Sequence, residues 1–424
     1  MSTGSTVRSS EANVSSPERP SNPWETSHVR IHRPVSLGYL PAQTGTGLVR
    51  LSGLEGLTRS LLMGTVPLIA LDRLGSKSAV SWAYTAGAIL TLLVTLNLGK
   101  LEQRIARRWV MTIGILSLFS AAILFTIDLV PAFVLAIGLR SAAASIFSVL
   151  VTLYVMDFVG KGELIQIESN RMVYNGIGWL IGPSLGLWLA RSVDPAAPFI
   201  LSAALSIPLL GYYWWLRVGN SEVITVAKST SPSALANIPR FFGQKYMRIA
   251  YTITFIRALF WVALFVFSPI YVVEAGFDDW VAGAVLSGVA ALLLAAPLIK
   301  RLSDSWGTRK IVYRAFGLVA LSMTGLASLG EPTGAGIALW FSAAVGAAAI
   351  DVVGNIPFMR MVKPRERVPM ATVFSTWREM SALIAPLLAA LVLGVGLPFT
   401  AFFALIGGLS AMAAIVSLRL PRRL

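Results

Sequence analysis

The basic loop "GKLEQRIARRW" (Gly99–Trp109) has a counterpart in "KRLSDSWGTRK" (Lys300–Lys310), in the second half of the chain. Arg108 of the first loop aligns with Arg309 of the second at an offset of 201 residues. Each loop follows one long apolar stretch and precedes another. Two copies of one loop in the same setting predict two homologous halves in parallel orientation, related by an axis along the membrane normal.

The composition indicates a membrane protein. Apolar residues make up 55% of the 424 residues and charged residues only 13%, against about 25% charged residues in soluble domains. Apolar runs of roughly 20 residues, the length that crosses a bilayer, recur along the chain. We therefore predict an all-α membrane protein with twelve transmembrane helices in two six-helix repeats, surrounded by the lipid bilayer. The spans are expected near 49–71, 78–98, 109–129, 132–155, 167–190, 197–216, 249–272, 280–299, 311–329, 334–358, 370–395 and 398–418.

Between and before these spans lie two polar segments. Residues 1–45 are rich in Ser, Pro and Thr and predict a disordered tail. The widest gap, 218–247, predicts a cytoplasmic linker between a first bundle (46–217) and a second (248–424). Most Lys and Arg of the short loops fall on one side, which predicts a multi-pass protein of the inner (plasma) membrane with both termini in the cytoplasm.

Several classes of chemistry are excluded by what the sequence lacks. There is no cysteine, and both histidines, His28 and His32, lie in the polar tail. No phosphate-binding loop of the G-x-x-x-x-G-K-[ST] type is present. We therefore expect no enzyme, no metal site and no cofactor. The net charge of +15 sits in clusters beside the spans, as membrane topology requires, so we expect no nucleic-acid partner.

The repeated loop resembles the signature G-x-L-a-D-r-x-G-r-R of the major facilitator superfamily. The second copy keeps Asp304, Gly307 and Arg309. The first copy has Gln103 where the family usually has Asp and Ala106 where it usually has Gly. The first copy keeps five other positions of the signature: Gly99, Leu101, Arg104, Arg107 and Arg108.

This resemblance implies an alternating-access transporter in which the loops act as cytoplasmic gates through charge contacts. Gln103 carries no charge, so Glu102 or Asp157 is expected to hold the arginines of the first loop instead. The alternative is that these arginines only fix the topology.

The span at 167–190 contains "NGIGWLIGPSLGLWLA" (Asn175–Ala190), which resembles a second family signature, g-x-x-x-G-P-x-x-G-G, found mainly in proton-coupled exporters. Glycines four residues apart form a flat stripe that lets a neighbouring helix approach closely. Proline inside a span permits bending. We expect a hinge and sliding face here, or alternatively a static kink. The residues concerned are Gly178, Gly182, Pro183 and Gly186, with Pro386 as the partner of Pro183 in the other half.

Ionisable residues inside spans are costly and usually face a cavity or a partner. Glu55 and Arg59 are four residues apart and share one helical face. Arg378 and Glu379 are adjacent, so they point about 100° apart on a helix. Interhelical ion pairs are the alternative for each. The proton and substrate cavity is predicted to comprise Glu55, Arg59, Arg140, Arg257, Asp351, Asn355, Arg378 and Glu379, with aromatic lining from Trp82, Tyr84, Trp179, Trp261 and Trp377.

Together these features predict a monomeric secondary transporter of a small-molecule substrate, coupled to the proton gradient and working as an exporter. Glu55 and Asp351 are the first candidates for the proton site. An importer or facilitator, including one for an anionic solute, is the alternative within the class. A receptor or scaffold that does not transport is the alternative from another class.

Overall fold

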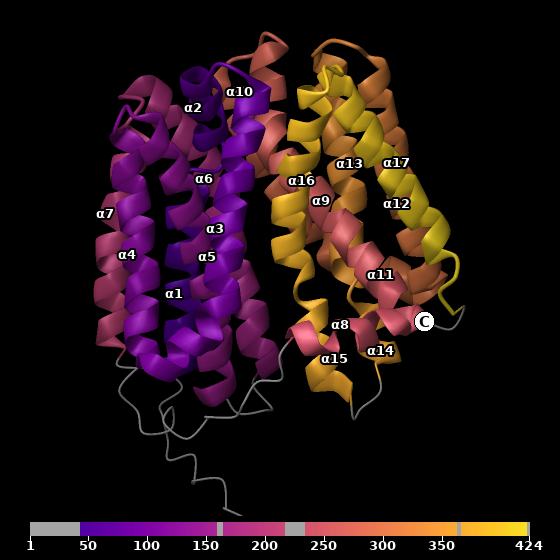
Figure 1. The fold of residues 1–424 in the computed structure, drawn as a ribbon, viewed down its shortest axis with the longest axis horizontal. Helices are drawn as coiled ribbons and strands as arrows, with labels where there is room; N and C mark the ends of the chain where they lie inside the picture. The colour runs from indigo at the N-terminus through magenta and orange to yellow at the C-terminus, as the bar shows by residue number, and fades with distance from the viewer. Residues whose placement is uncertain (1–42, 159–163, 217–233, 363–365, 422–424) are drawn as a thin grey trace, which may run out of the picture. The chain divides into compact units, whose positions relative to one another are not determined.

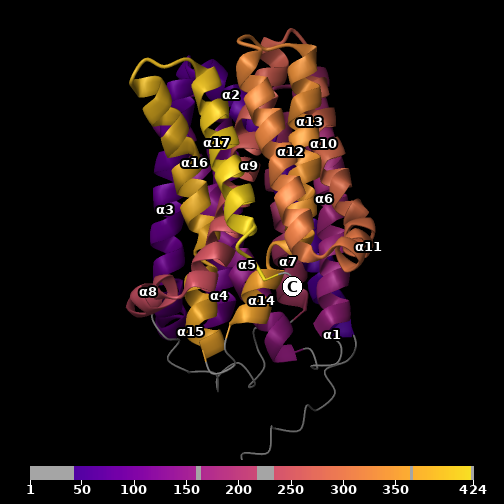
Figure 2. The same cartoon turned by 90° about the vertical axis from the view of Figure 1, so that its right-hand side faces the viewer.

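The computed structural model describes residues 43–158, 164–216, 234–362 and 366–421. Within these ranges every regular element is a helix. The predicted tail (1–45) therefore lies almost wholly outside the described residues, as does most of the predicted linker. Figures 1 and 2 show the helices running side by side in two groups, one from each half of the chain.

The first half forms seven helices because the first predicted span is broken. A turn at 61–64 divides that span into α1 and α2. The other helices are continuous through their predicted spans, and α6 stays helical through Pro183. The bounds are α1 Gln43–Ser60, α2 Thr65–Leu74, α3 Lys77–Arg104, α4 Arg107–Thr126, α5 Val130–Phe158, α6 Leu164–Ser192 and α7 Ala197–Trp215.

The second half has more interruptions. Proline stands in the first turn of both α11 and α14, where its missing N–H costs least. The short helix α8 lies inside the segment predicted as a linker. The bounds are α8 Ala234–Gly243, α9 Lys245–Glu274, α10 Asp279–Ala291, η3 Leu292–Ala295, α11 Ala296–Trp306, α12 Thr308–Ser328, α13 Gly334–Val353, α14 Ile356–Met361, α15 Arg367–Phe374, α16 Trp377–Gly394 and α17 Phe399–Ser417.

All twelve predicted spans coincide with helices. Ten helical stretches of the described chain are long and apolar enough to cross a membrane, and α10 is a shorter apolar helix. The remaining predicted span is α6, which is 29 residues long but carries polar residues, glycines and a proline. The prediction of an all-α membrane fold is confirmed.

The two halves meet along two pairs of helices. α6 packs against α10, and α3 packs against α16, as the adjacent ribbons of α3 and α16 in Figure 1 show. One apolar core is common to both halves and includes Leu187 of α6 and Leu286 of α10. Two further cores, around Val110 and around Ile311, each belong to one half. The common core lies toward the end of the helices away from the C-terminus.

The glycine stripe of α6 faces α1, inside the first half. A Cβ atom on Gly182 would lie 1.9 Å from Oγ of Ser60, and one on Gly186 would lie 1.9 Å from the backbone oxygen of Leu61. Ser60 also donates a hydrogen bond to the carbonyl of Gly178 at 2.7 Å. The region around Pro183 also meets α10, since a Cβ on Gly283 would lie 2.9 Å from the carbonyl oxygen of Pro183. The stripe therefore holds α6 on α1, while the proline region borders the other half.

Gly186→Ala is expected to destabilise the protein, because the new methyl group collides with backbone rather than with a mobile side chain. Overpacking of this kind costs about 1–3 kcal/mol, which lowers the melting temperature by several degrees. Gly176→Ala is the matched control, since nothing lies within 4 Å of its Cβ position. Thermal melts in detergent measure both variants. Equal melting temperatures would contradict the close contact.

Candidate functional site

The first charged unit lies where α1 ends. Nε of Arg59 is 2.9 Å from Oε1 of Glu55, one turn earlier on the same helix face. The Glu55 side chain is 5% exposed and that of Arg59 is 25% exposed. The guanidinium of Arg59 also lies over the ring of Trp179 on α6, 5.2 Å from its centroid. A buried carboxylate is thus held by an arginine that is itself partly open to its surroundings.

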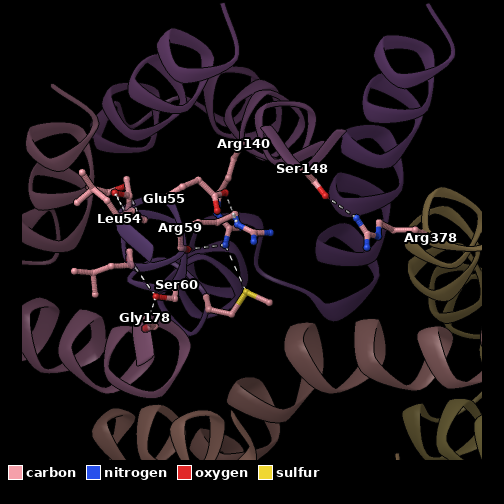
Figure 3. Close-up of polar contacts among 12 residues, drawn as sticks. Leu54, Glu55, Arg59, Ser60, Arg140, Ser148, Gly178 and Arg378 are labelled. Carbon is pink, nitrogen blue, oxygen red and sulfur yellow. Dashed lines mark hydrogen bonds and ion pairs between the residues drawn. The ribbon is translucent and has the colours of Figure 1, made fainter. Parts of the chain in front are cut away.

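Arg140 of α5 completes this unit. One of its Nη atoms donates to the backbone oxygen of Arg59 at 3.1 Å and lies 3.5 Å from the sulfur of Met63. The backbone N–H of Leu62, in the turn after α1, donates to the same carbonyl at 3.4 Å, so this oxygen accepts from both Leu62 and Arg140. Figure 3 shows the guanidinium groups of Arg59 and Arg140 beside each other.

The second charged unit belongs to the other half. Nη1 of Arg257 on α9 lies 3.0 Å from Oδ1 of Asp351 on α13, with side-chain exposures of 5% and 26%. The guanidinium of Arg257 lies 4.9 Å from the ring centroid of Trp377 on α16. Asn355 follows Asp351 by about one turn, and its buried Oδ1 has no hydrogen-bond partner among the described residues. Each half therefore places an arginine between a carboxylate and a tryptophan.

Arg378 and Glu379 point to different neighbours. Nη1 of Arg378 donates to the hydroxyl of Ser148 on α5 at 3.1 Å, a contact between the two halves that Figure 3 shows. The charge of Glu379 instead interacts with Tyr251 of α9. This divergence follows from their adjacent positions on one helix.

Aromatic rings connect the two units. Trp179 of α6 packs against Phe265 of α9, with ring centroids 5.4 Å apart. Phe265 stacks on Trp261 of the same helix, with ring centroids 5.5 Å apart. We call the resulting chain of contacts the central belt. It comprises Glu55, Arg59, Arg140, Ser148, Trp179, Arg257, Trp261, Phe265, Asp351, Trp377 and Arg378. The belt draws on six helices, α1, α5 and α6 from one half and α9, α13 and α16 from the other.

Sequence reasoning missed three members of this region. Arg171 of α6 forms an ion pair with Glu168 at 3.1 Å, and its charge also interacts with that of Arg378. The pattern E-x-x-R inside a predicted span was the available signal. Ser148 and Phe265 carried no signal in the sequence, because serine and phenylalanine are common in apolar spans. Of the aromatic residues predicted to line the site, Trp82 is 50% exposed on its helix and is not in the belt.

The repeated loops lie at the end where the C-terminus emerges. Arg107 places its guanidinium over the ring of Tyr154, 5.6 Å from the centroid. The backbone oxygen of Arg108 accepts a hydrogen bond from Tyr213 at 3.4 Å. Gly307 has a φ of 83° at the junction of α11 and α12, a conformation that favours glycine. Nη1 of Arg309 donates to the backbone oxygen of Leu420 at 3.4 Å.

For the other predicted gate and hinge residues the structure gives their position in a helix but fewer contacts. Gly99 and Arg104 lie in the last two turns of α3. The side chains of Glu102, Asp157 and Asp304 lie outside the described residues, so the predicted acid partners of the loop arginines stay predictions. Pro386 is buried within α16, which continues through it.

Three further contacts join the halves at the end of the helices away from the C-terminus. Nζ of Lys77 lies 2.7 Å from Oε2 of Glu274, and Nη1 of Arg191 lies 2.9 Å from Oδ1 of Asp278. Nearer the middle, the hydroxyls of Ser184 and Ser287 are 2.8 Å apart. We call the two ion pairs the outer pairs. They reinforce the apolar core that both halves share at this end.

Comparison with known proteins identifies the fold. Residues 51–348 match the model of the Major Facilitator Superfamily. The chain is 27% identical over 164 residues to the uncharacterized MFS-type transporter YdeE of Escherichia coli (strain K12); the match covers 38% of this chain and 41% of that relative's length.

Solved structures of similar fold cover nearly all of the chain. The nucleoside transporter NupG has a TM-score of 0.69 at 17% identity, covering 88% of this chain and 98% of its own. A D-xylose-proton symporter has a TM-score of 0.68 at 15% identity, covering 90% and 97%. A POT family transporter in complex with 5-aminolevulinic acid has a TM-score of 0.70 at 13% identity, covering 88% and 95%. The family model, the apolar helices and the shared fold together show that this chain belongs to the Major Facilitator Superfamily and is a multi-pass membrane transporter.

Proposed function

We propose that this transporter exports a small solute by alternating access and draws its energy from the proton gradient. The observation that carries the proposal is the construction of the central belt. Each half contributes one arginine–carboxylate pair, Glu55 with Arg59 and Asp351 with Arg257, and both pairs connect to contacts that cross between the halves. A proton on either carboxylate would change interactions on which the position of both halves depends.

The chemistry of coupling follows from these ion pairs. A carboxylate attracts its arginine, whereas a protonated carboxyl group is neutral and does not. Protonation of Glu55 would leave Arg59 with Trp179 and with the solute as its remaining partners. Glu55 is the more buried of the two acids, and Asp351 the more exposed. Asp351 is therefore the better placed to receive a proton, and Glu55 the better placed to hold one away from water.

The contacts between the halves support alternating access. At the end away from the C-terminus the outer pairs and a common apolar core close the space between the halves. Toward the other end the apolar cores are separate, one in the first half and two in the second. This arrangement suits a state that admits solute from the side of the C-terminus. Opening the opposite side would require the outer pairs to separate.

Two observations favour proton-coupled export. The pattern Gly178, Gly182, Pro183 and Gly186 resembles that of proton-coupled exporters, and it lies in α6, one of the helices that join the halves. A D-xylose-proton symporter has the same fold, so this fold accommodates proton coupling. Predicted cytoplasmic termini would make the accessible side the inner one, as loading for export requires.

Glu55→Gln is expected to reduce the stimulation of transport by a pH gradient about tenfold, because the amide cannot exchange a proton. Asp351→Asn is expected to do the same if the two acids work in sequence. A loss of about tenfold lies within the range of coupling free energies between sites. The measurement uses inverted vesicles and a solute first identified by comparing compound sensitivity of cells with and without the chain.

Asp128→Asn is the control, since that carboxylate is 92% exposed at a helix end. Solute exchange without a gradient should persist in all three variants. Undiminished gradient stimulation in both Glu55→Gln and Asp351→Asn would remove them as proton sites. If the proton gradient instead drives solute uptake into right-side-out vesicles, the protein is an importer rather than an exporter. If the unaltered protein exchanges no solute, the result favours a receptor or scaffold.

Lys77→Glu is expected to loosen the closed end, because it replaces the attraction to Glu274 by repulsion. The chain contains no cysteine, so a single Ser287→Cys substitution reports accessibility at this interface. A partly exposed ion pair contributes up to about 1 kcal/mol, so the maleimide reaction should accelerate by up to about fivefold. The double reversal Lys77→Glu with Glu274→Lys should restore the original rate. Failure of that restoration would show that the outer pairs do not hold the halves together.

A further inference from the structure

We infer that the central belt binds an anionic group of the solute, held between Arg140 of one half and Arg378 of the other. The expected substrate class is a small organic acid with a planar apolar part. This inference rests on the proposed transport function and specifies its substrate.

The central belt and its surroundings contain more arginines than carboxylates in ion-pair contact with them. Five arginines gather here: Arg59, Arg140, Arg171, Arg257 and Arg378. Three of them form an ion pair with a carboxylate. The pairs are Arg59 with Glu55, Arg171 with Glu168, and Arg257 with Asp351. Glu379 interacts with the charge of Arg378 only at longer range. In the part of the chain that the structure describes, Arg140 and Arg378 therefore lack a carboxylate within 4 Å.

The hydrogen-bond partners of these two arginines are neutral, and the carboxylates of Glu55 and Glu379 act on them only through charge at longer range. Arg140 bonds to a backbone carbonyl and a thioether, and its Nε is buried without a hydrogen bond. Arg378 bonds to the hydroxyl of Ser148. A guanidinium offers five donors, so most of those on Arg140 and Arg378 are unused. A charge within a membrane span is costly without an opposite charge, and an anionic solute would supply it.

Arg59 links these two groups, because its charge interacts with that of Arg140 and with that of Arg378. In Figure 3, Arg59 and Arg140 extend from one group of helices, and Arg378 extends from α16 toward them. Arg378 is exposed, and its charge interacts with those of Arg59 and Arg257 from both halves. Planar guanidinium groups bind carboxylates through two parallel hydrogen bonds. An anion in this position would replace the contact of Arg378 with Ser148 and so connect the halves through the solute.

The aromatic residues define the rest of the ligand. The guanidinium of Arg59 lies over the ring of Trp179, and those of Arg257 and Arg378 lie over the ring of Trp377. Arg59, Arg257 and Arg378 each lie beside an indole ring. A ligand with a carboxylate next to a planar ring would meet the guanidinium and the indole together. The same arginines would repel a lipophilic cation, which separates this site from one for cationic compounds.

Binding to the purified full-length protein tests the inference without requiring transport. The probes are benzoate and indole-3-acetate, each compared with its neutral amide, and benzylammonium as the cation. Both acids are expected to raise the melting temperature saturably, and benzoate is also expected to quench tryptophan fluorescence. The amides and the cation are expected to bind at least about tenfold more weakly, since hydrogen bonds to charged groups are the stronger ones.

Three variants assign the binding to the two arginines. Arg378→Gln and Arg140→Gln are each expected to weaken acid binding about tenfold or more. Ser148→Ala is expected to strengthen it, because it removes the hydroxyl that competes for Arg378, and this gain would not arise from a damaged fold. Arg73→Gln, outside the belt, the gating loops and the outer pairs, should leave binding unchanged. Equal binding of acids, amides and cation, or acid binding unaffected by Arg378→Gln and Ser148→Ala, would overturn the inference.

Exchange of radiolabelled benzoate in proteoliposomes separates this inference from the transport proposal. Arginine-dependent binding without exchange would retain the anion site and contradict transport. Exchange of other solutes by a protein that binds neither acid would retain transport and overturn the anion site.

Discussion

The arrangement of this protein depends on the need of an intramembrane charge for a partner. Arg59 forms an ion pair with Glu55 and Arg257 with Asp351, with nitrogen–oxygen distances of 2.9 and 3.0 Å. The guanidinium of each arginine also lies over the ring of a tryptophan. Such pairs are retained in membrane spans where they face a pathway or each other. Here they face the seam between the halves, where aromatic rings and the bond from Arg378 to Ser148 join them. Solute, proton and the relative position of the halves would therefore act on one set of contacts.

The fold was predictable because its determinants are local. Apolar runs set the helices, and the repeated loops at Gly99 and Lys300 set the two halves. The interruptions were harder to predict. The turn after Ser60 contains Gly64 and comes just before Pro67, which has no N–H to donate to the carbonyl of Met63, so a local signal for this break was present. The helix α8 lies in a polar segment whose composition suggests a loop, and no local signal marked it.

The candidate site was predictable as a set of residues but not as a set of contacts. The cost of charge in a membrane span identified Arg140, Arg257 and Arg378 without a structure. Their partners could not be inferred, since spacing reveals only pairs on one helix, such as Glu55 with Arg59. The pairing of Arg257 with Asp351 joins residues 94 positions apart. The glycines of α6 show the same limit: sequence indicated a close helix contact but not that α1 makes it.

The central claim is that the belt lines a water-filled space reached alternately from each side of the membrane. The most direct measurement is the labelling of a single cysteine at Ser148, which lies in the belt and is partly exposed. A membrane-impermeant maleimide should reach Ser148→Cys from the side of the C-terminus in the resting protein. It should reach the same cysteine from the opposite side when both outer pairs are broken by Lys77→Glu together with Arg191→Glu. A cysteine at this position that stays unlabelled from both sides in both backgrounds would contradict the claim.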